Sequence, residues 1–439
     1  MRSVSSTMFK KISFLGVLWI CCFSQADAQT ENSPYSRYGI GDQIPSQHIL
    51  SRGMGGVSAA YADYQSVNFM NPASYSRLRL TTFDFGTEID SRTIRSIDPP
   101  RKFTGTSPII SYVQLGFPLS AKRNWGLSFG LRPLTRINYK IEDRSRDNSS
   151  LDSLYTLYEG SGGSYQVHAG TGVAFKNLSL GVNVGYLFGS KDYTTRRSFL
   201  PDDTSTVFYY PSKHTTRSNF GGLFMNAGVQ YSAKLSKKLR LQLGAYGNVK
   251  QTMNASRDQT IETYRGDING DVQIDSIYQI DDIEGKMIYP ASYGLGFILN
   301  GAEQWQFGMD YTATKWSEYR IFNTADQVQD SWKLNVGGSV VPNILNPRTY
   351  FGRVVYRAGF SFGKDYVKVN DQDLPTWGVS FGAGLPMRRG NYSNQVSLIN
   401  TALEFGQRGN KENIIRENYF RLSVGLTLSD IWFQKRQYQ

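Results

Sequence analysis

Apolar residues alternate with small or polar ones along many short segments of this sequence, and this period of two constrains the fold most strongly. Between Phe420 and Leu428 every second residue is apolar, and the residues between them are Arg, Ser, Gly and Thr. The same pattern recurs in 125–132, 239–246 and 377–385. Such alternation is typical of β-strands that have one apolar face. The sequence therefore predicts an all-β protein.

The expected strands are fourteen in number, and the connections between them alternate between short and long. We place the strands near 80–90, 107–118, 124–132, 163–176, 178–188, 218–233, 239–250, 290–300, 303–314, 331–342, 352–362, 375–385, 395–406 and 418–429. Long connections are expected at 133–162, 189–217 and 251–289. Short turns on one side and long loops on the other are typical of outer-membrane barrels, whereas a soluble sandwich has no reason to sort its loops. We therefore predict a 14-stranded antiparallel transmembrane β-barrel.

The composition suits a sheet that turns one face to lipid. Aromatic residues make up 14% of the chain, charged residues only 19%, and there are 43 glycines. A mean hydropathy of −0.40 excludes a protein of many membrane helices, because each such helix needs about 20 apolar residues. Many glycines fall on the face opposite the apolar one, which leaves space inside the barrel. Something must fill that space or pass through it.

Tryptophans are expected to mark the two edges of the membrane. Indole prefers the membrane–water interface, because it joins an apolar body to a polar N–H group. All six tryptophans outside the N-terminal 28 residues fall at or just beyond the ends of predicted strands. This aromatic girdle consists of Trp125, Trp305, Trp316, Trp332, Trp377 and Trp432.

Residues 1–28 have the features of a secretory signal peptide. Basic residues precede the apolar stretch 12–23, and an A-x-A cleavage site ends at Ala28, before Gln29. Both cysteines of the chain lie in this segment, so the mature protein is expected to use no disulfide. We expect cleavage between Ala28 and Gln29 and a location in the cell outer membrane.

The basic balance of the chain points to no nucleic-acid partner. The net charge of +12 falls to +10 without residues 1–28, which hold three basic residues and one acidic residue. An exported chain rarely meets nucleic acid, and the basic residues are dispersed over separate short turns. Contact with the phosphates of outer-membrane lipids and lipopolysaccharide is one use for them. Simple solvation explains them equally well.

Residues 29–79 precede the first strand and are rich in glycine and proline. The stretches 51–63 (SRGMGGVSAAYAD) and 68–73 (NFMNPA) resemble the FadL family (OMPP1/FadL/TodX type) of outer-membrane transporters for hydrophobic compounds. In that family such motifs belong to an N-terminal hatch that blocks a fourteen-stranded barrel. The resemblance implies a hatch motif made of Gly53, Gly55, Gly56, Asn71, Pro72 and Ala73.

The resemblance to the better-known members of that family is incomplete. Many of them continue Asn-Pro-Ala with Gly, whereas Ser74 follows here. Segment 159–163 and the tail that begins at Trp432 are similar to a version of the barrel widespread in Bacteroidota, so ligand specificity does not transfer from fatty-acid transporters. The expected domains are a signal peptide at 1–28, a hatch or plug in the lumen at 29–79, the barrel at 80–429 and a short basic periplasmic tail at 430–439.

Three segments match the G-x-S-x-G motif of serine hydrolases, at 126–130, 359–363 and 378–382. A nucleophile elbow needs a sharp strand-to-helix turn with a histidine and an acid nearby. These three segments instead lie within alternating strands, with no helical pattern after them. We therefore expect a protein that is not an enzyme and binds no cofactor.

One weak metal candidate lies in the long connection 251–289. Asp267, Asn269, Asp271 and Asp275 are spaced like the oxygen ligands at positions 1, 3, 5 and 9 of a calcium loop. The glycine expected at position 6 and the acid expected at position 12 are both missing. A solvated loop or an Asn-Gly hairpin turn is the better interpretation.

Two functions fit the predicted barrel. The first is a channel or transporter of hydrophobic, fatty-acid-like small molecules, which enter from the long-loop side and pass when the hatch moves around Pro72. The alternative is a non-enzymatic barrel subunit of a Bacteroidota outer-membrane protein machine, in protein secretion or outer-membrane assembly. The first requires a hydrophobic small-molecule ligand as partner, and the second requires other outer-membrane proteins.

Overall fold

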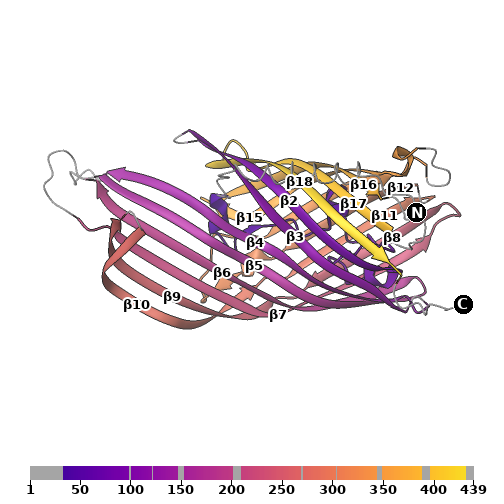
Figure 1. Ribbon diagram of the computed structural model, residues 1–439, viewed down its shortest axis with the longest axis horizontal. Helices are drawn as coiled ribbons and strands as arrows, with labels where there is room; N and C mark the ends of the chain where they lie inside the picture. Colours follow the sequence, from indigo (N-terminus) through magenta and orange to yellow (C-terminus); the bar gives the residue numbers. More distant parts are fainter. Residues whose placement is uncertain are drawn as a thin grey trace, which may run out of the picture.

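The computed structural model describes residues 33–97, 100–120, 122–146, 153–200, 209–267, 270–302, 304–343, 349–387 and 396–431. They form one long barrel, shown from the side in Figure 1. The predicted signal peptide, Asn269, Trp432 and residues 432–439 of the predicted tail lie outside the described residues. No helix within these ranges is long and apolar enough to cross a membrane.

The barrel wall is built from antiparallel strands, each paired with its neighbours along the chain. The wall segments are β2 (Thr81–Ser96), β3 (Arg101–Ser120), β4 (Trp125–Arg146), β5 (Ser153–Phe175), β6 (Leu178–Leu200), β7 (Ser212–Lys234), β8 (Leu239–Asn248), β9 (Gln251–Asp267), β10 (Gly270–Tyr289), β11 (Ser292–Gly301), β12 (Trp305–Thr314), β14 (Ser331–Val340), β15 (Val355–Val369), β16 (Gln372–Pro386), β17 (Val396–Arg408) and β18 (Ile415–Asp430). β18 pairs with β2 from Ile415 opposite Ser96 to Asp430 opposite Thr81, which closes the barrel.

These sixteen segments make fourteen wall strands, because two strands are interrupted once each. β8 and β9 both pair with β7, one after the other, so together they form one wall strand. β11 and β10 continue each other in the same way against β8 and β9. The two-residue strands β1 (Asp42–Gln43) and β13 (Arg320–Ile321) pair with β4 and β10 and are not wall strands. The prediction of a 14-stranded antiparallel barrel is confirmed.

The two ends of the barrel differ, and we call them the short-turn end and the hairpin end. At the short-turn end, where β18 finishes, β5 and β6 are joined by Lys176 and Asn177 alone. At the hairpin end β4 to β7, β9 and β10 extend far beyond the other strands (Figure 1). The prediction of long loops at 133–162, 189–217 and 251–289 is wrong, because most of these residues form paired strands.

A chemical difference between the two halves of these long strands explains the error. Near the short-turn end of β5, Tyr165, Val167 and Phe175 face outward and are exposed, as a lipid-facing surface requires. Beyond Tyr165 the strand continues for twelve more residues to Ser153, or about 40 Å along its axis. Because neither face of this extension meets hydrocarbon, its sequence shows no apolar alternation.

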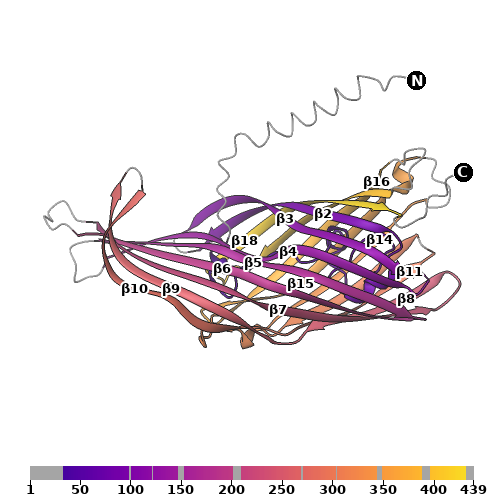
Figure 2. The same cartoon turned by 60° about the horizontal axis from the view of Figure 1, so that its bottom comes forward.

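The segment that precedes β2 fills the barrel lumen. It contains the short helices η1 (Pro34–Arg37), α2 (Ile49–Arg52) and η2 (Pro72–Arg77), together with β1. In Figure 2 this indigo segment lies inside the barrel. Ser33 bonds to Glu417 near the hairpin end, whereas Leu78 packs near Gly116 toward the short-turn end. We call residues 33–79 the plug, and its position in the lumen confirms that part of the predicted fold.

An aromatic cluster closes the lumen above the plug, at the hairpin end. The connection from β12 to β14 carries η3 (Trp316–Glu318) and folds inward. Trp316 lies 4.7 Å from Tyr366 between ring centroids, and both are buried with Tyr319 and Ile40 of the plug. The remaining short helix, η4 (Phe351–Arg353), lies at the short-turn end between β14 and β15.

Candidate functional site

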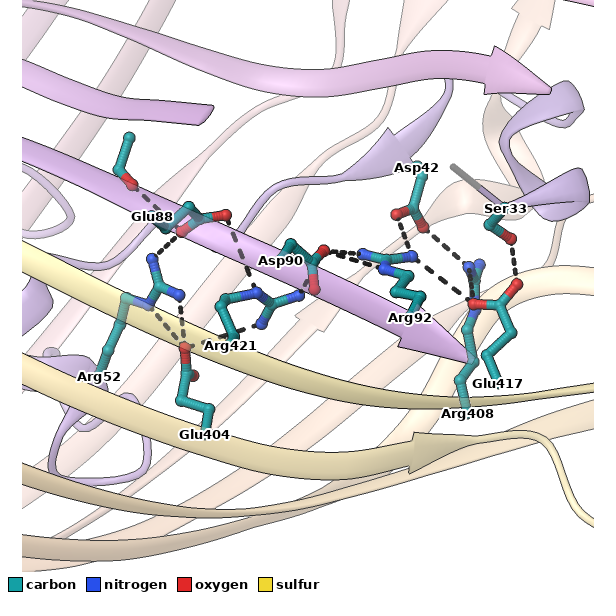
Figure 3. Close-up of polar contacts among 11 residues, drawn as sticks. Ser33, Asp42, Arg52, Glu88, Asp90, Arg92, Glu404, Arg408, Glu417 and Arg421 are labelled. Carbon is teal, nitrogen blue, oxygen red and sulfur yellow. Dashed lines mark hydrogen bonds and ion pairs between the residues drawn. The ribbon is translucent and has the colours of Figure 1, made fainter. Parts of the chain in front are cut away.

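The contact between the plug and the wall is the most densely charged place in the lumen. Figure 3 shows arginines and carboxylates from the plug and from β2, β17 and β18 in one continuous network. Four arginines alternate with carboxylates along it, and strand register brings several of them together directly. Arg421 of β18 lies opposite both Asp90 of β2 and Glu404 of β17.

One end of the network is built around Arg52, the last residue of α2. Its guanidinium ion-pairs with Glu88 of β2 and Glu404 of β17, and only 1% of its side chain is exposed. Arg421 joins the same two carboxylates at 3.8 and 3.7 Å, and bonds Asp90 at 3.3 Å. A guanidinium this deeply buried stays charged only because carboxylates surround it. This part of the network therefore fixes α2 to the wall.

The other end of the network is built around Asp42 of β1. Arg408 of β17 donates to Asp42 Oδ1 at 2.8 Å, and Arg92 of β2 ion-pairs with Asp42 Oδ2. Arg92 also bonds Asp90 at 2.9 Å, which links the two ends. Ser33 at the start of the plug donates to Glu417, which lies 3.6 Å from both Arg92 and Arg408. The plug is thus held at three separate points.

The electrostatics of the two plug residues favour their charged forms. Burial tends to raise the pKa of the Asp42 carboxyl, but Arg92 and Arg408 outweigh burial and hold this pKa below its ordinary value of 3.8. Burial likewise tends to lower the pKa of Arg52, but Glu404 and Glu88 outweigh it and raise that pKa. Both groups are therefore ionised at neutral pH. We call the ion pairs that Arg52 and Asp42 make with the wall the lock, and the lock is closed at neutral pH.

Glycines of the wall let the plug backbone pack directly against the wall backbone. A side chain at Gly244 would overlap the carbonyl oxygen of Ala59, and one at Gly337 would overlap that of Met54. Gly126 and Gly359 meet the plug backbone in the same way, at Tyr75 and Gly55. The glycine-lined lumen predicted from the sequence is therefore occupied by the plug.

Two of the predicted hatch glycines have backbone conformations that are unfavourable for residues with a side chain. Gly55 and Gly56 have φ angles of +71° and +94°, in the left-handed region. Gly53 ends α2 with a φ of −60° and packs on Gly382 of β16, where a Cβ atom would lie 3.0 Å from the Gly382 Cα. The glycine-rich stretch thus turns the plug tightly while it touches the wall.

The Asn-Pro-Ala stretch anchors the half of the plug that lies toward the short-turn end. Asn71 caps η2 by accepting a hydrogen bond from the Ala73 N–H at 3.1 Å, and Pro72 stands at the first position of the helix. The Asn71 side chain also donates to the Ala59 carbonyl at 2.6 Å. Asp310 of β12 accepts the N–H groups of Ser58 and Ala59 at 2.5 and 2.7 Å. These bonds fix the plug to itself and to the wall.

Two cavities formed by the described residues lie on opposite sides of the plug. The cavity toward the hairpin end has about 350 Å³ and is lined by Arg52, Gly55 and Gly56 on the plug side. The cavity at the short-turn end has about 1850 Å³ and is lined by Leu50 and Met54 of the same plug segment. Residues 50–56 therefore separate the two spaces.

Both cavities have mixed linings, in which charged side chains stand beside apolar ones. The smaller one is lined by arginines and carboxylates of the network, besides Tyr289, Trp316 and Trp332. The larger one is lined by six basic residues. Among the described residues that line it, Asp63 is the single carboxylate. The basic residues are Lys234, Lys237, Lys238, Arg240, Arg353 and Arg357. Apolar side chains line both cavities as well, such as Leu134 and Phe224 in the smaller one and Leu239 and Leu398 in the larger one.

The predicted girdle tryptophans fall into three groups. Trp125 and Trp305 are exposed at the short-turn ends of β4 and β12. Trp332 and Trp377 lie near the opposite ends of β14 and β16, and Trp332 is level with Ala313, eight positions from Trp305 on β12. This is about 27 Å along the strand, close to the height of an outer-membrane apolar band.

Trp316 differs from the girdle expectation, because only 2% of it is exposed and it belongs to the aromatic cluster inside the lumen. The chain turns inward directly after β12, so a tryptophan just past a strand end points into the barrel instead of toward lipid. Trp432 lies outside the described residues.

Asp267, Asp271 and Asp275 of the calcium candidate belong to β9 and β10, and Asn269 lies outside the described residues. Gly270 is the register partner of Asp267, so both strands continue up to these two residues. Asp271 ion-pairs with Arg196 at 3.1 Å, which occupies its carboxylate with a protein cation, and Asp275 is exposed. Over the described ranges, no group of three or more His, Cys, Asp or Glu side chains is placed to hold a metal ion.

The ion-pair network is the part of the site that the sequence interpretation missed. Its signal was present in β2, where Glu88, Asp90 and Arg92 occupy every second position on the face that turns inward. Charges at a period of two on the inner face of a barrel strand must meet partners in the lumen. Which partners they meet depends on strand register, which the sequence does not supply.

Solved structures share this architecture. The P. putida toluene transporter TodX matches with a TM-score of 0.59 at 16% identity, over 89% of this chain and 100% of its own. A Pseudomonas aeruginosa FadL homologue matches with a TM-score of 0.57 at 12% identity, over 90% and 100% of the two chains. The CymD monoaromatic hydrocarbon channel gives a TM-score of 0.54 at 15% identity, over 89% and 99%. At these identities the likeness concerns the fold alone.

The closed wall and the N-terminal plug give the protein the fold of the FadL/TodX-type outer-membrane β-barrels. Within this class, the chain belongs to the BamG family, whose model matches residues 8–439. No protein with a curated description matches the sequence.

Proposed function

We propose that this protein is a non-enzymatic, Bam-associated barrel subunit of the machinery that assembles proteins into the outer membrane of Bacteroidota. The observation that carries the proposal is the match of the BamG family model to residues 8–439, which include the whole barrel and the plug. Its partners are then other outer-membrane proteins, and lipids and lipopolysaccharide surround its wall.

The lock between the plug and the wall supports this proposal. A subunit needs a rigid body that keeps its surface in one shape, and the plug is held by buried ion pairs at Arg52 and Asp42. A conduit that opens by plug movement would have to break these pairs. Breaking one buried pair typically costs about 3–5 kcal/mol. The rigid body is therefore the state that the geometry favours.

Transport of a hydrophobic small molecule remains the second candidate, and the likeness to the toluene transporter TodX favours it. In that case a ligand passes after the plug has moved. The smaller cavity argues against this use, because arginines and carboxylates line it beside its aromatic residues.

A disulfide between the plug and the wall separates the two functions. We choose Ile49→Cys with Gly425→Cys, because a Cβ atom on Gly425 of β18 would lie 3.5 Å from the Cβ atom of Ile49 in the plug, a separation that a disulfide can span, and both native cysteines are in the predicted signal peptide. In the subunit role, the oxidised variant should sustain normal levels of other outer-membrane barrels, as the reduced variant does. Depletion of the protein should lower those levels together.

The opposite pattern would support transport. Oxidation would then abolish uptake of a hydrophobic compound such as toluene and dithiothreitol would restore it, while depletion would leave the other barrels at their normal levels. The single variant Ile49→Cys serves as the control for the effect of the substitution itself.

A further inference from the structure

The β9–β10 hairpin carries an unpaired strand edge beyond the membrane region. β10 pairs with β9 along its length, and its other edge pairs with β13 at Met287 and Ile288 alone among the described residues. The Lys286 carbonyl accepts a hydrogen bond from the Phe322 N–H at 3.0 Å, and Phe322 also packs on Gly285. From Gly270 to Glu284, no strand among the described residues pairs with that edge. Figure 2 shows the tip of this hairpin standing away from the neighbouring hairpins.

Apolar side chains on β10 are exposed where lipid cannot cover them. Val272 and Ile277 are 54% and 63% exposed, and Ile274 and Ile280 are also exposed. Tyr293 on β11 is level with Trp332, which is near the upper limit of the apolar band. Ile280 is thirteen residues beyond Tyr293, or on the order of 40 Å along the strand, and Val272 is further still. Another protein is therefore the natural cover for these residues.

The hairpin has the opposite charge to the rest of the chain. Residues 251–289 hold eight acidic and three basic residues, a net charge of −5, whereas the whole chain carries +12. On β10, Asp271 is paired with Arg196. Asp275, Asp281, Asp282 and Glu284 have no basic partner among the described residues. A basic partner would neutralise them.

We propose that the free edge of β10 from Gly270 to Glu284 docks an extended segment of another protein, in which basic residues alternate with apolar ones. The segment would add to the sheet as a further strand, with main-chain hydrogen bonds for affinity and its lysines or arginines against the carboxylates of β10. This inference rests on the proposed role as a subunit and identifies the surface and chemistry of one partner.

A second copy of the chain is a poor occupant of this edge. Two β10 edges paired with each other would place acidic strands side by side, and like charges across a strand pair are destabilising. β10 also has register shifts between Gln273 and Asp275, Ser276 and Tyr278, and Ile280 and Ile283. Bulges and charges of this kind keep an edge from pairing with copies of itself. The edge is thus selective.

Site-specific photocrosslinking in the native membrane tests the docking edge. A benzoylphenylalanine at Ile277 of the full-length protein should form an adduct with one other protein, through a stretch in which Lys or Arg alternate with apolar residues. The same probe at Ile97, which is 52% exposed at the tip of the β2–β3 hairpin, should not form that adduct. Adducts with lipid alone, with a second copy, or with the same protein in equal yield at both positions would overturn the proposal.

A charge variant shows whether the carboxylates take part. Asp275→Lys with Asp281→Lys should lower the yield of the Ile277 adduct at least tenfold. The matched variant Glu142→Lys with Asp143→Lys, on the exposed extension of β4, should change it by less than twofold. Undiminished adduct in the β10 variant would contradict the proposal. If the β10 variant also retains all its co-purifying proteins, the subunit role stands and the docking edge falls; a wild-type protein with no protein partner would refute both.

Discussion

At the scale of single residues, the wall glycines set the distance between plug and wall. Gly244→Val should push the Ala59 segment off the wall, because the new side chain would occupy the place of the Ala59 carbonyl oxygen. Overpacking of this kind costs about 1–3 kcal/mol. We expect faster amide hydrogen exchange over residues 53–73 and a lower melting temperature. Gly266→Val is the matched control, because nothing lies within 4 Å of a Cβ atom there, and it should change neither.

The buried guanidinium of Arg52 should matter more than any exposed ion pair. Arg52→Leu leaves Glu88 and Glu404 with one fewer cation, so we expect a loss of about 3–5 kcal/mol in the stability of the plugged state. Arg217→Leu, which removes an exposed pair with Asp192, should cost less than about 1 kcal/mol. Urea titration that follows proteolysis of the plug would measure both. Equal costs for the two variants would contradict the lock.

The depressed pKa of Asp42 predicts how the lock depends on pH. A carboxyl whose pKa is lower in the folded protein than in the unfolded chain adds stability above the unfolded value, and this stability disappears as the pH falls through the folded value. The contribution of Asp42 to plug protection, measured as the difference between the wild-type protein and Asp42→Asn, should therefore be constant from neutral pH down to about 4 and should decline below it. Asp42→Asn should weaken the plug at neutral pH and flatten the decline. A decline that begins near pH 6 would point to a different group.

At a few positions the residue type alone suits the backbone conformation that the structure shows. Gly55, Gly56 and Pro72 are of this kind, since left-handed φ angles and a helix start favour these residues. The pairing of Arg52 with Glu88 and Glu404 is not, because these residues are brought together from a helix and two strands that are far apart in the chain. Only the closed barrel places them in contact.

At the scale of elements, the apolar alternation identified each wall strand inside the membrane region and none of the extensions. The part of β5 from Tyr165 to Phe175 alternates because one side faces lipid. Both faces of the part before Tyr165 are in polar surroundings, so its sequence needs no alternation of apolar and polar residues. The hydrogen bonds between neighbouring strands do not require alternation, and the strands continue.

The β9–β10 hairpin should be dispensable for folding. β8 and β11 pair directly through ten residues each below it, from Ser292 opposite Asn248 to Gly301 opposite Leu239. Replacing residues 258–283 by a Gly-Ser turn should therefore leave a barrel with the same heat-modifiable migration in gels. It should remove the protein partner at β10. Loss of the folded barrel would show instead that the extension nucleates or supports the wall.

At the scale of the whole molecule, the fold alone does not determine the function of the protein. The barrel shares its architecture with the toluene transporter TodX at 16% identity, which is a likeness in fold alone. This chain has a plug bound to the wall by buried charges and a sheet that extends far beyond the other strands at the hairpin end. Both features suit a rigid body with a large external surface better than they suit a passage.

Native mass spectrometry of the protein, extracted gently from its own outer membrane, tests the subunit role most directly. If the protein is a subunit, we expect a complex in which the mature chain is bound to other outer-membrane proteins in fixed stoichiometry, with the plug in place. A monomer that carries a reproducible small apolar molecule and no protein partner would contradict it, and would identify the barrel as a transporter of that molecule.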